Sequence, residues 1–181
     1  MKYTDVYLTP NRWSRPGIPL DRPKAIVLHW FFNPGTSARS AVNWWESRKD
    51  GGNGYGSAHI AIDDNEVLRA VPIHERAYHV GALEYTRFSQ QIIGPSPNSH
   101  CIGVELAHAD LTGEPSRMVW DTAADVVADL CRITALDTSC IITHFDITGM
   151  LEKWNGIPDH PWFVQQPGEM ARFRAEVAQR I

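Results

Sequence analysis

Apolar residues occur along the chain in two patterns. Three segments built around short apolar runs are typical of buried β-strands. They lie at Lys24–Trp30, His100–His108 and Cys140–His144. Between Met118 and Leu136 the apolar positions instead recur at i, i+3 and i+4, which predicts a long amphipathic helix.

Turn and capping residues divide the rest of the chain. Capping residues and Pro167 predict two more helices, about Ala38–Lys49 and about Gly168–Arg180. Ser57–Asp63 and Glu66–Pro72 read as a hairpin around a polar turn. Because strands alternate with helices, we expect an α/β fold with a central mixed β-sheet flanked by helices.

Two segments lack a clear period. Residues 1–22 hold three prolines and few apolar positions, so we expect an extended N-terminal arm that crosses the domain. Ile73–Asn98 is long for an irregular loop, and loops of that length are often functional.

Composition limits the class of protein. A chain of 181 residues with 43% hydrophobic residues suits a single domain, 1–181. The net charge of −4 argues against a nucleic-acid partner. No apolar run reaches the length of a membrane span, and the N-terminus is too polar for a signal peptide. We therefore expect a protein made in the cytoplasm, whose cysteines (Cys101, Cys131 and Cys140) are buried free thiols. We expect a monomer, although no sequence feature determines the oligomeric state.

Two histidines end predicted strands. His29 and His144 each follow an apolar run, and ligands in open α/β sheets bind at the carboxyl ends of the strands. Asp159 closes the turn-rich loop that follows His144. Two imidazoles and a carboxylate suit a catalytic zinc ion, which takes three protein ligands and keeps a fourth position for water. His160 is the competing third ligand.

Other polar residues have two interpretations each. Glu105 interrupts an apolar strand, where an unpaired carboxylate is costly to bury. It points either to solvent or into a polar cleft, where it could act as a general base. His59 and His79 are further cleft candidates, and local hydrogen bonding is the alternative for both.

Seven short blocks in a fixed order carry a family resemblance. They are Ile26–Trp30, Asn33–Thr36, Ser57–Ile60, Ala77–Gly81, Ile102–Leu106, Thr143–Gly149 and Pro161–Val164. In these blocks the chain resembles the zinc-dependent N-acetylmuramoyl-L-alanine amidases of the type-2 family. That family shares its fold with peptidoglycan recognition proteins, and the similarity is strongest to the catalytic domains of phage and prophage endolysins.

The resemblance implies roles for particular residues. One zinc ion would be held by His29, His144 and Asp159, where Asp159 stands at a position that is often cysteine. Glu105 would be the catalytic residue. Ile157 occupies the usual lysine position, so Lys153, or a histidine such as His79, is the candidate to help hold the oxyanion. The predicted substrate-binding residues are Trp30, His59 and His79.

The same resemblance implies a substrate. We expect hydrolysis of the amide between N-acetylmuramic acid and L-alanine in peptidoglycan, by a single catalytic domain without a separate wall-binding domain. A protein without a signal peptide would reach the wall after phage or prophage lysis, or by another route. The alternatives are a cytoplasmic amidase that recycles anhydromuramyl peptides and a non-catalytic peptidoglycan-binding module. The presence of His29, His144 and a carboxylate at 159 argues against the module.

Overall fold

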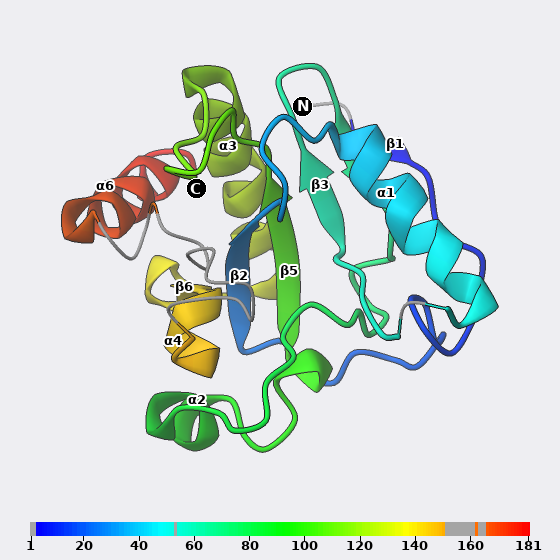
Figure 1. Cartoon of the computed structure of the whole chain (residues 1–181). Coiled ribbons are helices and arrows are strands. Elements are labelled where there is room, and N and C mark those ends of the chain that lie inside the picture. The colour runs from blue at the N-terminus through cyan, green and yellow to red at the C-terminus, as the bar shows by residue number, and fades with distance from the viewer. Residues whose placement is uncertain (1–2, 53, 151–161, 163–165) are drawn as a thin grey trace.

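The computed structural model describes residues 3–52, 54–150, 162 and 166–181. Within them, six strands form one sheet in the order β1-β4-β3-β5-β2-β6 (Figure 1). The strands are β1 (Thr4–Asp5), β2 (Ala25–Trp30), β3 (Ile60–Ile62), β4 (Val67–Arg69), β5 (Cys101–Leu106) and β6 (Ile141–Thr143). The β3–β4 pair is antiparallel and the other pairs are parallel, so the predicted mixed sheet is confirmed.

The helices flank this sheet (Figure 1). They are α1 (Ala38–Ser47), α2 (Arg87–Ile92), α3 (Arg117–Thr134), α4 (His144–Thr148) and α6 (Pro167–Ala178), with 3-10 turns η1 (Arg48–Asp50), η2 (Pro97–Ser99) and η3 (Thr138–Cys140). Ser37, Thr86 and Ser116 each accept a hydrogen bond at the start of α1, α2 and α3, as N-cap side chains do. None of the described helices has the length and hydropathy needed to cross a bilayer.

The two faces of the sheet contact different parts of the core. Alternate residues of a strand point to opposite faces. The buried hydrophobic residues form a larger and a smaller cluster. Leu28 of β2 belongs to the larger cluster, which also contains Phe173 of α6. Val27 belongs to the smaller cluster, with Ile147 of α4. By this alternation His29, two residues after Val27, lies on the face of the smaller cluster.

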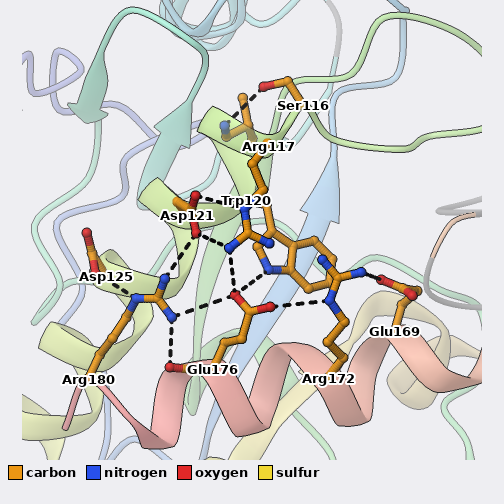
Figure 2. A network of polar contacts seen from close by, with 10 residues as sticks. Ser116, Arg117, Trp120, Asp121, Asp125, Glu169, Arg172, Glu176 and Arg180 are labelled. Atoms are coloured by element: carbon orange, nitrogen blue, oxygen red, sulfur yellow. Dashed lines mark hydrogen bonds and ion pairs between the residues drawn. The ribbon is translucent and has the colours of Figure 1, made fainter.

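Helices α3 and α6 are joined by a charged network over an aromatic contact (Figure 2). Glu176 accepts a hydrogen bond from Trp120 Nε1 at 3.0 Å, and Arg180 donates to Asp121 at 3.1 Å. Beneath it, Trp120 meets the buried Phe173 edge-on, with ring centroids 5.2 Å apart. Partly exposed ion pairs contribute little individually, so the aromatic packing carries most of this contact.

Several expectations need correction. The arm contributes a strand, because β1 pairs with β4. The hairpin strands are shorter than predicted, and the segment expected to be irregular contains α2. All three cysteines are free, but Cys140 is only partly buried. It ends the 3-10 turn η3 and does not begin the strand β6, which places it near the surface.

Candidate functional site

Two buried histidines meet at the carboxyl ends of β2 and β6. The strands pair in parallel, with Leu28 opposite Thr143, so His29 and His144 follow at the same level. Their ring centroids lie 5.2 Å apart, and each residue is 3% exposed. The structure therefore brings together two imidazoles that are separated by more than one hundred positions in the sequence.

A capping box fixes the position of His144. Thr143 is the N-cap of α4, and its hydroxyl accepts a hydrogen bond from Asp146 N at 3.2 Å. Asp146 Oδ2 in turn accepts one from Thr143 N at 2.7 Å. Since His144 is the first residue of α4, both the strand register and the cap hold its backbone in place. The Thr-x-x-Asp pattern is the sequence signal for this turn of helix, in a segment that the sequence otherwise predicts to be a loop.

Glu105 lies beside His29. The two residues are register partners in the parallel β2–β5 pair, and such partners point to the same face of a sheet. Glu105 is half-buried. Glu105 therefore lies on the same face of the sheet as His29. This position agrees with the interpretation in which its carboxylate faces a polar cleft.

His79 contacts His29 directly. Its Nδ1 lies 2.9 Å from His29 Nε2, and the rings meet edge-on at 87°. His79 Nε2 lies 3.1 Å from the carbonyl oxygen of Cys101. Desolvation, followed by the charge of His59, lowers the pKa of His79 to about 3, so the ring is neutral near pH 7.

His59 is fully buried against backbone groups. Its Nε2 lies 2.9 Å from the carbonyl oxygen of Glu75, and its Nδ1 accepts a hydrogen bond from Gly103 N at 3.0 Å. Desolvation lowers the pKa of His59 to about 4. Trp30 is 6% exposed and stacks on His108, with ring centroids 4.3 Å apart. The substrate roles of His59, His79 and Trp30 stay predictions, and for all three we find local contacts in the structure.

The remaining candidates lie outside the described residues. These are Lys153, Asp159 and His160. Among the residues that are described, no group of three histidine, cysteine, aspartate or glutamate side chains is arranged to hold a metal ion. His29 and His144 thus provide two possible donors, and the third ligand stays a prediction.

Comparison with models of known protein families shows which family this chain belongs to. The model of the Amidase_2 family, N-acetylmuramoyl-L-alanine amidase, matches residues 19–158. The chain belongs to this amidase family. The match spans His29, Glu105 and His144, and it confirms the resemblance inferred from the sequence blocks.

Relatives of the amidase family cover almost the whole chain. A Bacillus licheniformis protein named "Probable N-acetylmuramoyl-L-alanine amidase" is 32% identical over 177 residues, which are 98% of this chain and 47% of that protein. N-acetylmuramoyl-L-alanine amidase CwlL, from the same organism, is 30% identical over 183 residues, with the same coverages. The chain thus spans about half the length of these relatives.

A solved structure has the same fold. The structure of PlyL superposes with a TM-score of 0.74 at 20% sequence identity, and the match covers 98% of this chain and 97% of that one. At this identity the likeness establishes the fold alone. The predicted α/β architecture is therefore correct.

Proposed function

We propose that this chain is a zinc-dependent amidase that hydrolyses the bond between N-acetylmuramic acid and L-alanine in peptidoglycan. The observation that carries the proposal is the pair His29 and His144, buried at adjoining strand ends, with Glu105 on the same face. Family membership and the names of the relatives support the choice of bond.

The residues fit a zinc ion. His29 and His144 are buried imidazoles with centroids 5.2 Å apart, a donor pair typical of zinc. Asp159, in the segment after α4, is proposed as the third ligand, with His160 as the alternative. A zinc ion bound by this set would supply a Lewis acid and a water whose pKa is lowered to about 7.

Glu105 has the role of general base and then general acid. It would accept a proton as a water oxygen forms the new bond to the lactyl carbonyl carbon. It would then give that proton to the alanine nitrogen as the C–N bond breaks, which leaves a carboxylate and a free amine. Lys153 is proposed to stabilise the negative charge on the carbonyl oxygen, a role worth about 10²–10³-fold in kcat where a single donor has been removed.

The substrate and setting form part of the proposal. We propose that one monomer with one zinc ion acts on the glycan strand and stem peptide of the wall, after release from the cell that makes it. The recycling alternative shares the chemistry and differs only in its preference for soluble anhydromuramyl peptides.

The test uses purified cell wall and the variant Glu105→Gln. The wild type should release new L-alanine amino termini without new reducing sugar ends. Glu105→Gln should lose about 10²–10⁴-fold in turnover while its zinc content is unchanged, because it removes a proton acceptor and no ligand. Glu84→Gln is the matched control, because the Glu84 carboxylate is exposed in the loop before α2. This variant should hydrolyse cell wall as fast as the wild type.

Three outcomes would contradict parts of this account. Near-wild-type turnover by Glu105→Gln would exclude Glu105 from the mechanism. A wild type that releases no L-alanine amino termini from any muramyl peptide would overturn the function. Cleavage of soluble anhydromuramyl peptides without cleavage of intact wall would assign the enzyme to recycling.

A further inference from the structure

A chain of hydrogen bonds runs from a backbone carbonyl to His29. The Cys101 carbonyl oxygen can only accept, so His79 Nε2 carries a proton and donates it over 3.1 Å. In the neutral ring, His79 Nδ1 then holds a lone pair. It accepts a hydrogen bond over 2.9 Å from His29 Nε2, which must carry a proton in turn. The lone pair of a neutral His29 ring is consequently on Nδ1.

We propose that His79 is a positioning residue that selects the tautomer and orientation of His29, so that Nδ1 of His29 faces the metal. The inference rests on the proposed function, because it takes His29 to be a zinc ligand. It gives His79 a role different from the substrate contact expected from the sequence. Outer partners of this kind typically change metal affinity by about 10–100-fold when they are removed.

The fold provides a specific place for the His79 ring. A Cβ atom at Gly103 would lie 2.6 Å from Cγ of His79, so the ring packs directly on the backbone of β5. Glycine inside a strand often marks such a close approach. Because a larger residue at 103 would displace the ring, Gly103 is part of this arrangement.

The backbone of His79 is held separately. Asn98 Oδ1 accepts hydrogen bonds from His79 N and Val80 N, each at 3.0 Å. Asn98 Nδ2 donates to the carbonyl of Val80 at 2.9 Å. Ring and backbone are therefore fixed by different elements, as expected for a side chain whose direction matters.

Two nearly isosteric variants separate hydrogen bonding from packing. In His79→Asn the amide oxygen takes nearly the place of Nδ1 and can accept from His29 Nε2. In His79→Leu a methyl group takes that place. Zinc affinity, measured on the folded metal-free proteins by competition with a chelator, should fall about 10–100-fold in His79→Leu. In His79→Asn it should return to within a few-fold of the wild type.

The control removes a buried histidine elsewhere. His108 is 5% exposed, and its nitrogens contact the carbonyls of Asp110 and Phe31. His108→Leu should keep wild-type zinc affinity. Wild-type affinity in His79→Leu, equal losses in His79→Leu and His79→Asn, or an equal loss in His108→Leu would each overturn the proposal.

A second readout needs neither metal nor variants. Long-range proton–nitrogen NMR spectra of the metal-free wild type should show the His29 and His79 protons on Nε2. A His29 proton on Nδ1 would overturn the inference even if His79→Leu did not fold. A wild type that takes up no zinc would instead reject the proposed function, and the NMR spectrum would still decide the tautomer.

Discussion

His59 shows how burial of a single residue affects stability. It is 0% exposed, and its pKa is lowered to about 4 by desolvation, against an ordinary value near 6.5. The unfolded chain therefore binds a proton between about pH 6.5 and 4 while the folded chain does not. The contribution of His59 to the free energy of unfolding should be fully present above pH 6.5. It should be lost progressively as the pH drops, which lowers the free energy of unfolding by on the order of 3 kcal/mol at pH 4.

This pH dependence can be measured by urea unfolding of the zinc-free protein between pH 7.5 and 4. His59→Gln lacks the titrating group, so its stability should change less over the same interval. Equal pH slopes for the wild type and His59→Gln would show that His59 does not cause the effect.

Residues differ in how far their sequence context predicts their place. His29 and His144 could be brought together in advance, because each ends an apolar run and parallel strands end at one edge of the sheet. The contact of His79 with His29 could not. That contact depends on the hydrogen bond from His79 N to Asn98 and on the space left by Gly103, which has no Cβ atom. No local sequence pattern around His79 indicates that Asn98 or Gly103 lies next to it.

The element that matters most for the site is the short helix α4. Removing the N3 carboxylate of the capping box in Asp146→Ala should lower the free energy of unfolding by about 1 kcal/mol, because Thr143 N loses its acceptor. Zinc affinity should fall as well, since His144 begins this helix. Denaturant titration and chelator competition measure the two effects.

Asp137→Ala is the matched control for that prediction. Asp137 caps η3 by accepting a hydrogen bond from Ser139 N at 2.7 Å. Its loss should reduce stability but leave zinc affinity unchanged. If both variants weakened zinc binding equally, the cap of α4 would have no special role in placing His144.

Element length explains which parts of the fold were predictable. Helix α3 has 18 residues with a regular apolar stripe, and β2 and β5 are six-residue strands in which the only polar or charged side chains are His29 and Glu105. Helices α2 and α4 have six and five residues. Helices this short show too little periodicity to stand out, and they form through caps and tertiary contacts.

At the scale of the whole molecule, the sheet separates packing from chemistry. The larger core cluster includes alternate residues of β2 and β5 together with α3 and α6. His29 and Glu105 follow the opposite alternation, on the face of the smaller cluster. Substitutions in the larger cluster should therefore act on stability first, whereas those around the histidines act on metal and turnover.

The zinc content of the purified protein tests the central claim most directly. The wild type should bind one zinc ion per chain, and His29→Ala and His144→Ala should each lose it while they remain folded by circular dichroism. Asp159→Ala should also lose the ion if the carboxylate is the third ligand. One tightly bound zinc ion per chain in folded His29→Ala or His144→Ala would contradict the account.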